Sequence, residues 1–272
     1  MEYTQIFETR TSNKNYEEKV QTSGFGYVPV KAEGAATSYD SHSQGYVSRW
    51  TNIAYAMGYI ATKEELADNL YTEVSMDRAE SLAFSLRQTE ETVGANVLNR
   101  AFNTSFTGGD GSVLAATTHS DFHGTWSNHL TTAADISEAS LEDLCIQVMQ
   151  ALNPRGLKIN LVPTRLIVPV NSCFDVERIL KSQLQNDSAD NAVNALRTKG
   201  MIPEVAINHY LTDTDAWFIK TSCPNGLTWY NRANAEFTQD NDFDTENAKA
   251  KVYRRFSVGW GDPRTIYASP GA

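Results

Sequence analysis

Hydrophobic side chains recur at mostly four-residue steps between residues 63 and 102, in a stretch that contains no proline. This spacing puts one apolar side chain on the same face at each helical turn, and it predicts a single long amphipathic helix. Thr62 followed by Glu65 fits a capping box at its start, and the polar and glycine residues after Asn103 end it. Gly94 has a low helix propensity, and in an alternative interpretation two consecutive helices are separated there. The aligned apolar residues are Leu66, Leu70, Val74, Leu82, Leu86, Val93, Val97 and Ala101.

The chain before this helix changes from an irregular to an alternating pattern. Residues 1–45 are rich in Thr, Ser, Gly and Glu and show no sustained periodicity, which is typical of an arm that runs into an extended loop. A polar arm and a projecting hairpin have no core of their own, so we expect their partners to lie on another molecule. Residues 45–62 alternate and predict an extended strand with one face formed by Val47, Ile53, Tyr55, Met57 and Tyr59.

The second half of the chain mixes short strands with short helices. The apolar run "RLIVPV" predicts a buried strand, and "SCFDVERILKSQL" after it resumes helical spacing, so an α/β layer is expected here. Two more strands are predicted in "VAINHYLTDTDAWFIKTS", separated by residues 212–215, and "AKAKVYRRFSVGW" alternates so that Arg254 and Arg255 point to opposite faces. A helix is predicted in "SEASLEDLCIQVMQALN", with Ser140 as its cap and an inner stripe of Leu141, Leu144, Val148 and Leu152.

Composition narrows the class of protein. A net charge of −10 argues against a protein that binds nucleic acid by neutralising its phosphates. No apolar run reaches the roughly 20 residues of a membrane helix, and the first residues lack the regions of a signal peptide. Three cysteines without a C-x-x-C spacing indicate free, buried thiols in a reducing compartment; they are Cys145, Cys173 and Cys223.

The stretch "TTHSDFHGTWSNH", residues 117–129, is the strongest candidate for metal chemistry. His119 and His123 have the H-x-x-x-H spacing, with Asp121 between them and His129 close behind. In the helical zinc motif the residue after the first histidine is a glutamate, but here it is Ser120. The Thr, Gly and Ser neighbours favour a loop, so we expect no metal and a polar loop that forms contacts within or between subunits.

Two further patterns resemble binding motifs without completing them. The acidic run at Asp240, Asp242 and Asp244 begins like a calcium loop, but the required glycine and glutamate are replaced by Thr245 and Lys251. A surface turn is therefore expected. The glycines at 24/26, 108/109/111 and 259/261 have no adjoining strand, helix and lysine that would make a phosphate cradle, and we expect turns there too.

The order of elements resembles that of the major capsid (head) protein of tailed bacteriophages, with the Hong Kong 97 phage-type capsid fold. The resemblance covers nearly the whole chain, and three stretches carry it and favour the Mu-like head subunit branch. The first is "TEETVGANVLNRAFN" followed by "GGDGSVLAATTHS", and the second is "LIVPVNSCFDVERILKSQL". The third is "DAWFIKTSCPNGLTWYNR" leading into "DNDFDTENAKAKVYRRFSVGWGDPRTIYASPGA".

The resemblance implies an α+β fold in which a long spine helix crosses one domain and flexible projections reach neighbouring subunits. A helix of roughly 60 Å suits such a strut better than it suits a compact enzyme core. The implied division is an N-terminal arm (1–26), an extended β-hairpin loop or E-loop (27–61), a peripheral domain with the spine helix (62–157), an α/β axial domain (158–230) and return strands of the peripheral domain (231–272).

The resemblance also implies a structural function. The chain would self-assemble into hexamers and pentamers of an icosahedral phage head that encloses double-stranded DNA without sequence-specific binding. Catalytic, cofactor-binding and metal-binding residues would be absent. Scaffolding protein, maturation protease, portal and possibly a decoration protein would be its partners, in the bacterial cytoplasm and then in the virion. Only about 26 residues precede "YVPV", so we expect either a separate scaffolding protein or a scaffolding segment that was already removed.

Two alternatives stay open at this point. The first is the shell of an encapsulin-like nanocompartment, which has the same fold and encloses protein cargo. The second belongs to another class, a metal-dependent hydrolase that uses His119, Asp121 and His123.

Overall fold

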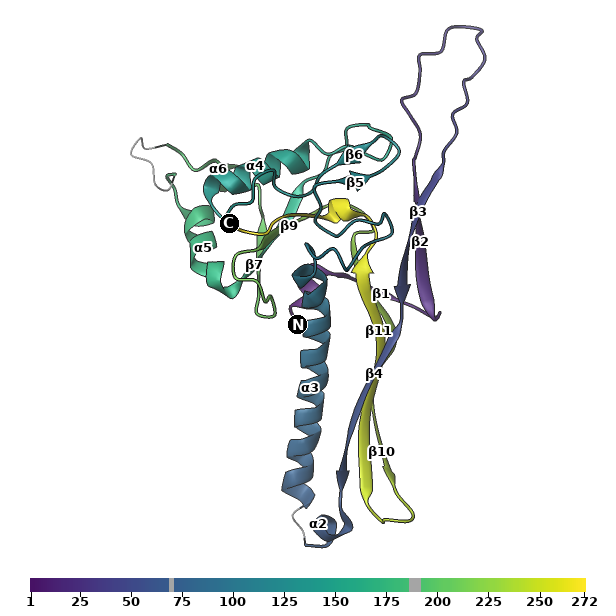
Figure 1. The fold of residues 1–272 in the computed structure, drawn as a ribbon, viewed down its shortest axis with the longest axis vertical. Coiled ribbons are helices and arrows are strands. Elements are labelled where there is room, and N and C mark those ends of the chain that lie inside the picture. The colour runs from purple at the N-terminus through teal and green to yellow at the C-terminus, as the bar shows by residue number, and fades with distance from the viewer. Residues whose placement is uncertain (69–70, 186–191) are drawn as a thin grey trace.

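The computed structural model describes residues 1–68, 71–185 and 192–272, and the side chains of residues 66 and 71–76 are not described. A long helix and a long sheet run side by side, a more compact α/β layer lies at one end, and a hairpin projects beyond it (Figure 1). The helices are α1 (Tyr3–Ile6), α2 (Lys63–Ala67), α3 (Tyr71–Asn99), α4 (Glu138–Met149), α5 (Cys173–Lys181) and α6 (Ala195–Lys199), with the 3-10 turns η1 (Val170–Ser172) and η2 (Pro263–Thr265).

Twelve strands are assigned within the described residues. They are β1 (Glu8–Thr11), β2 (Tyr16–Thr22), β3 (Gln44–Thr51), β4 (Ile53–Ala61), β5 (His119–Ser120), β6 (Thr125–Trp126), β7 (Pro163–Pro169), β8 (Glu204–Asn208), β9 (Trp217–Thr221), β10 (Leu227–Asn241), β11 (Ala248–Trp260) and β12 (Ile266–Ser269).

The predicted long helix is present as the short α2 and the 29-residue α3. The capping box at its start is confirmed: Thr62 Oγ1 accepts a hydrogen bond from Glu65 N, and the Glu65 carboxylate accepts one from Thr62 N. The alternative break at Gly94 is wrong, because α3 continues through it. A side chain there would meet Tyr3 Cβ at 3.0 Å, so glycine permits close packing and causes no kink. Of the predicted apolar face, Leu66, Leu70 and Val74 lie outside the described side chains.

The long sheet has the strand order β1-β10-β11-β4 and lies along α3 (Figure 1). The prediction of one strand over residues 45–62 is wrong, because the chain divides at Asn52 into β3 and β4. At Asn52 the partner strand changes from β2, which pairs up to Thr51, to β11, which pairs from Ile53 onward. The buried Asn52 side chain bonds at this point to Ser12 Oγ, Lys14 O and Ser257 Oγ. Val47 lies in β3 and does not share the face of Ile53 in β4.

The projecting hairpin consists of β2 and β3, which pair antiparallel from Tyr16↔Thr51 to Thr22↔Gln44. The predicted boundary at residue 26 therefore falls inside the hairpin, whose first strand lies in the segment expected to be an arm. Residues 53–61 belong instead to the long sheet, because β4 pairs with β11. These boundaries are set by strand pairing between distant segments, and local periodicity does not show which segments pair.

The compact layer contains a sheet of order β12-β9-β7-β8, with β7 and β8 parallel. The predicted strand "RLIVPV" and the two strands on either side of residues 212–215 are confirmed. One face of the sheet packs against α4, α5 and α6 and the other against the end of α3. Burial of both faces explains why β7 is apolar without alternation: Leu166 and Val168 face the helices, and Ile167 faces α3.

The cap of α4 is Ser137 and not Ser140. Ser137 is extended, its hydroxyl accepts a bond from Ser140 N, and the Ser140 hydroxyl accepts one from Ser137 N. The prediction placed the cap one turn late because either serine precedes the apolar stripe. Leu141, Leu144 and Val148 are fully buried as predicted, whereas Leu152 lies beyond the helix.

The N-terminal segment is tied to the junction of helix and sheets. The Glu91 carboxylate of α3 accepts hydrogen bonds from Glu2 N and Tyr3 N, both at 2.9 Å. Tyr3 stacks on Trp229 with ring centroids 4.1 Å apart. The Glu2 carboxylate bonds to His209 through the backbone N at 2.9 Å and Nδ1 at 2.6 Å. These contacts join α3, β10 and the loop after β8 through one short segment.

We expect Glu91→Ala to loosen this N-terminal segment and to lower the free energy of unfolding by about 2 kcal/mol, because two amides lose a buried charged acceptor. Hydrogen exchange by mass spectrometry should show faster exchange at residues 1–7, and Glu80→Ala on the exposed side of α3 is the matched control. Unchanged exchange at residues 1–7 would contradict the anchoring role.

Candidate assembly surfaces and the histidine-rich loop

The tip of the hairpin, residues 23–43, exposes large apolar side chains. Tyr27, Val28, Val30 and Tyr39 are 80%, 94%, 100% and 95% exposed. An apolar patch of this kind on a subunit marks a surface that another molecule covers. The sequence predicted the extended loop, but only the structure shows that its apolar residues have no cover within the subunit.

The base of the hairpin is held against the body of the subunit. Trp50 is buried against Gly259 and Gly261, where a Cβ atom would lie 2.9 and 3.3 Å from its ring. Ser48 Oγ donates to Gly261 O at 3.3 Å. Gly259 therefore lies within β11 and allows close approach of Trp50, so the expected turn at this position is wrong.

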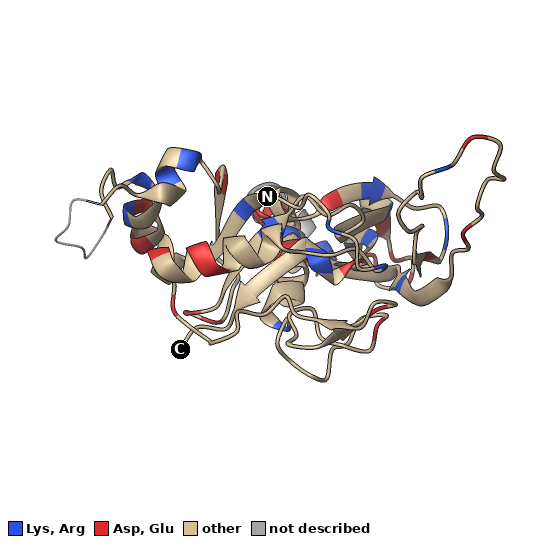
Figure 2. Cartoon of the chain, turned by 90° about the horizontal axis from the view of Figure 1, so that it is seen from above, with Lys and Arg blue, Asp and Glu red and all other residues tan. Residues whose placement is uncertain are grey.

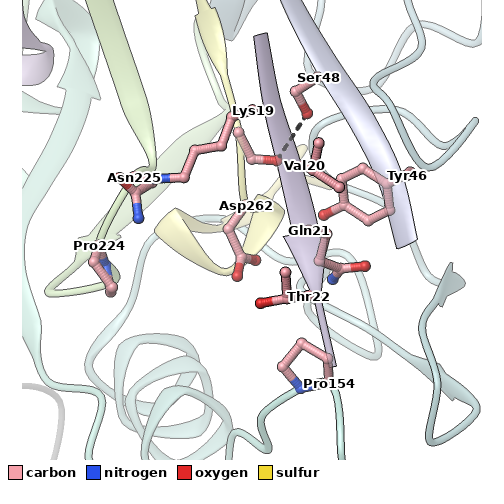
Figure 3. Close-up of a pocket in the computed structure, with 11 residues that line it drawn as sticks. Lys19, Val20, Gln21, Thr22, Tyr46, Ser48, Pro154, Pro224, Asn225 and Asp262 are labelled. Atoms are coloured by element: carbon pink, nitrogen blue, oxygen red, sulfur yellow. Dashed lines mark hydrogen bonds between the residues drawn. The ribbon is translucent and has the colours of Figure 1, made fainter. Parts of the chain in front are cut away.

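An open pocket of about 210 Å³ lies beside this base. Lys19 and Thr22 of β2 and Tyr46 of β3 line one side, and Asn225 and Asp262 approach from the body (Figure 3). Burial is the main cause that raises the pKa of Tyr46, so its hydroxyl stays protonated. The walls of this pocket come from both the hairpin and the body, so the pocket lies where the two parts join.

Arg155 provides a second attachment for the hairpin. Its guanidinium donates to both carboxylate oxygens of Asp40, at 2.8 and 3.1 Å, and to Ser41 O at 3.2 Å. Asp40 also accepts a bond from Gly26 N at 2.8 Å, which brings the two sides of the tip together. Backbone and guanidinium bonds lower the pKa of this carboxyl, so the attachment is ionic at neutral pH. No sequence pattern singled out Arg155.

The histidine-rich loop is a buried hydrogen-bonding centre. His119 is fully buried; its Nδ1 lies 2.6 Å from Asp110 Oδ2 and its Nε2 lies 3.0 Å from Asn128 Oδ1. Asn128 Oδ1 also accepts from Ala116 N, so the amide orientation is set and Nε2 is a donor. The Asn128 amide nitrogen donates to three carbonyl oxygens, that of Leu114 in the loop before β5 and those of Pro263 and Ile266 in the C-terminal segment.

The other candidate metal ligands are engaged elsewhere. Asp121 forms a buried ion pair with Arg264, whose guanidinium also lies 4.2 Å from the Trp126 ring centroid. The His123 ring lies against Gly156, where a Cβ atom would meet Nδ1 at 2.4 Å. His119, Asp121 and His123 therefore do not converge. Across the described part of the chain, no group of three or more His, Cys, Asp and Glu side chains is arranged to hold a metal ion.

The predicted contact within the subunit is confirmed for this loop. His119, Asp121 and Asn128 bond to the loop before β5 and to the C-terminal segment. The sequence indicated the histidines, but it did not single out Asn128 or Arg264, which bind the most partners. Neither residue type carries a spacing signal, because their partners are carbonyl and carboxylate groups far along the chain.

Charge on the subunit is mixed. Basic and acidic residues are interspersed in the view of Figure 2, and the acidic turn at the tip of β10 and β11 binds Lys249 through Asp242. The side-chain bond from Lys249 lowers the pKa of Asp242. Phe243 at the same turn is 96% exposed. Among the described residues, no helix is long and apolar enough to span a membrane.

One charged pair is buried between α3 and β11. Glu90 is 1% exposed and forms an ion pair with Arg254. Burial raises the pKa of Glu90, and the Arg254 guanidinium opposes this shift. Arg255, its neighbour in β11, points the other way and donates to Asn52 O, so the predicted opposite orientation of the two arginines is confirmed.

All three cysteines are free, but only Cys145 is buried, so the prediction of buried thiols is wrong for Cys173 and Cys223, which are partly exposed. We expect Cys173 to react first with iodoacetamide at pH 8, because burial raises the pKa of Cys145 to about 11 and also raises the pKa of Cys223. Mass spectrometry of the folded protein should show one fast alkylation, which Cys173→Ser removes. Fast labelling of Cys145, which is 2% exposed, would contradict this expectation.

The uncovered hairpin tip indicates a subunit that other molecules cover, and comparison with known proteins identifies its class. The family model described as phage capsid protein matches residues 52–269. The chain belongs to the phage capsid protein family. No curated protein matches it in sequence.

Solved capsid structures share the fold over almost the whole chain. The capsid of the native GTA particle has 13% identity and a TM-score of 0.62, and the match covers 100% of this chain and 90% of that one. The capsid of cyanophage P-SCSP1u has 9% identity and a TM-score of 0.59, and the match covers 98% of this chain and 86% of that one. The virus-like particle from Pyrococcus furiosus has 10% identity and a TM-score of 0.51, and the match covers 98% of this chain and 91% of that one.

The predicted α+β Hong Kong 97-type capsid fold is thus confirmed, and the chain is a capsid shell protein. Family and fold are structural in kind and imply self-assembly and a place in the capsid of the virion. Membership of the Mu-like branch stays a prediction.

Proposed function

We propose that this chain forms the hexamers and pentamers of an icosahedral phage head that encloses double-stranded DNA. The main support for this proposal is the hairpin tip, where Val28 and Val30 are 94% and 100% exposed. Such apolar side chains need a second copy to cover them. Quasi-equivalent positions suit a long projection of this kind, because it adapts to neighbours in slightly different orientations. The net charge of −10 suits a container that has to release its DNA.

The proposal assigns no catalytic, cofactor-binding or metal-binding residues and treats the chain as a structural protein and not an enzyme. The separate partners of His119, Asp121 and His123 support this view over the hydrolase alternative. Stoichiometric zinc or iron in the purified protein would contradict it.

We also propose a division into arm, E-loop, peripheral domain and axial domain, with two of the expected boundaries moved to agree with the strand pairing. The E-loop corresponds to the β2–β3 hairpin, and β4 joins the peripheral domain with α3, β10 and β11. Scaffolding protein, maturation protease and portal are the proposed partners, with a decoration protein as a further one. Assembly would take place in the cytoplasm of a bacterial host.

Electron microscopy of the overexpressed chain tests the proposal. We expect rings, capsomers or closed shells when the chain is produced with its scaffold. A chain that stays monomeric under these conditions would contradict the head function.

A nanocompartment shell is the second candidate, favoured by the likeness to the virus-like particle from Pyrococcus furiosus. The contents of purified particles separate the two candidates, because a phage head packages DNA and a nanocompartment encloses protein. Particles that hold one host protein at fixed stoichiometry, and never DNA, would favour the nanocompartment.

A further inference from the structure

Basic side chains gather where β1, the base of the hairpin and the compact sheet meet. On the face of the compact sheet that packs against α3, Lys220 of β9 is the cross-strand neighbour of Arg165 in β7. The hydrogen bond from Arg10 is the main cause that lowers the pKa of Glu8 in β1. The charges of Lys220 and Lys19 lower this pKa further, so both lysines lie within electrostatic reach of Glu8. We name Lys19 of β2 and Lys220 the junction lysines.

The acidic side chains of this region are already paired with its arginines. Arg10 donates from Nε and Nη2 to the two carboxylate oxygens of Glu8, at 3.0 and 2.9 Å. Glu204 of β8 is the cross-strand neighbour of Arg165 and forms an ion pair with it. Among the described residues, the ammonium groups of the junction lysines have no hydrogen-bond or ion-pair partner. Two positive charges therefore stay without a partner in a chain whose net charge is −10.

Both junction lysines are half-buried, which is costly for a charge without a partner. Burial is the main cause that lowers the pKa of Lys19, and the nearby Arg10 lowers it further. Burial and the nearby Arg165 lower the pKa of Lys220 in the same way. Because burial and a neighbouring cation both disfavour the ammonium form, a bound anion would offset both effects. The electrostatics of this region therefore favour an anion from outside the subunit.

Lys19 can be reached from outside the subunit. It lines the open pocket of about 210 Å³ at the base of the hairpin, where its side chain extends from β2 toward Asn225 (Figure 3). Asp262 is the one carboxylate among the described residues that line this pocket, and its Oδ1 already accepts a bond from Arg264 N at 3.0 Å. The pocket is smaller than the roughly 300 Å³ of a typical small-molecule site, so it suits a single anionic group of a larger molecule.

A row of phosphate groups fits two lysines on separate strands better than one small anion does. Strands β2 and β9 belong to different sheets, so the junction lysines approach a ligand from different elements. DNA carries one negative charge per roughly 1.7 Å of helix axis, so separate phosphates can each meet one ammonium group. Lysine binds phosphate as a point charge, without the fixed geometry of arginine. The chemistry therefore favours the sugar-phosphate backbone of a nucleic acid.

We propose that the junction lysines bind phosphate groups of the DNA that the head encloses. The inference rests on the proposed head function and names a surface through which the subunit contacts the contents of the shell. Contacts to phosphate carry no sequence information, so this surface accepts any DNA. Two contacts per subunit are weak and sensitive to salt, and the acidic remainder of the chain repels DNA. The DNA is thus held loosely and can still leave the head.

Fluorescence anisotropy of a short labelled DNA duplex tests the proposal on the purified, unassembled full-length chain. At about 50 mM salt, Lys19→Gln and Lys220→Gln should each weaken binding roughly tenfold, because each removes one phosphate contact. The logarithm of the association constant should fall with the logarithm of the salt concentration. The slope should be about −1.8 for the unaltered chain and about −0.9 for either variant.

A matched pair of substitutions controls for the change in net charge. Lys199→Gln combined with Lys251→Gln removes as much charge as Lys19→Gln combined with Lys220→Gln, but it does so at exposed positions in α6 and β11. This control should bind DNA like the unaltered chain. Lys19→Arg and Lys220→Arg keep the charge and should also bind DNA normally. Circular dichroism checks that each variant is folded.

The outcomes separate this inference from the head function. Equal loss of affinity in the control pair and in the junction pair would overturn the site, since it would show a general effect of charge. An unaltered chain that does not bind the duplex at low salt would also overturn it and leave the shell function intact. Sodium pyrophosphate is the competing probe. If it displaces the duplex at an equal concentration of phosphate groups, the lysines bind small phosphate compounds and the DNA backbone is the wrong ligand. A chain that binds the duplex but never assembles with its scaffold would contradict the head function itself.

Discussion

Leu82→Pro is expected to abolish shell assembly and solubility together. Leu82 lies in the interior of α3 and is 5% exposed. Proline there removes a helical hydrogen bond and pushes its ring against the carbonyl four residues earlier, which costs about 3 kcal/mol or more. The buried leucine side chain is lost at the same time. Since α3 supports the long sheet and contacts the segment that carries Glu2 and Tyr3, the damage extends through the subunit.

The matched variant is Leu82→Ala, which keeps the helical backbone and removes only side-chain packing. It should lower the free energy of unfolding by about 2–3 kcal/mol and still give soluble protein. The measurements are the soluble fraction after expression and electron microscopy of the product. Normal shells from Leu82→Pro would show that the continuous helix is unnecessary for the fold.

Asn128→Asp is expected to be nearly as damaging, although the two side chains have almost the same shape. The Asn128 amide nitrogen donates to Leu114 O at 2.7 Å, Ile266 O at 2.9 Å and Pro263 O at 3.1 Å. A carboxylate would place negative charge against three carbonyl oxygens in a fully buried position. We expect the free energy of unfolding to fall by about 3 kcal/mol or more at neutral pH.

Urea unfolding followed by tryptophan fluorescence measures this loss. Asn153→Asp is the control: Asn153 is only partly buried, and its Oδ1 accepts bonds from Arg155 N and Leu157 N, which a carboxylate can also accept. That variant should change stability by well under 1 kcal/mol. Equal stability of Asn128→Asp and the unaltered chain would show that the hydrogen bonds of Asn128 do not hold the loop.

Local patterns predicted the long helix, α4, α5 and the strands β7, β8, β9 and β11, but they did not mark β1, β2, β5, β6, β10 or β12. The long helix, its capping box and the apolar strand β7 depend on neighbours a few residues apart, and periodicity and capping residues record such neighbours directly. The same patterns failed at Asn52, where the chain stops pairing with β2 and begins to pair with β11, and where buried side-chain bonds join Asn52 to Ser12 and Ser257. Both partners are distant in sequence, and no window along the chain contains them.

The candidate sites also depend on partners that are distant in sequence. The sequence drew attention to His119 through an H-x-x-x-H spacing, and the tertiary structure turned it into a buried partner of Asp110 and Asn128. An extended loop was predicted, whereas the position of β4 at the edge of the long sheet was not. An edge exists only once strand order is known, and strand order is set by pairing across the whole sheet.

The sequence by itself determined the class of fold and, through its resemblance to phage head proteins, the kind of protein. It did so because helix length, burial periodicity and the order of elements depend on residues that are close together along the chain. Only the tertiary structure decided where the hairpin begins, which residues join the histidine-rich loop to the C-terminal strand, and which surfaces remain for a neighbour. Those features depend on hydrogen bonds between segments outside any local window, from the pairing of β2 with β3 to the bond between Asn128 and Ile266.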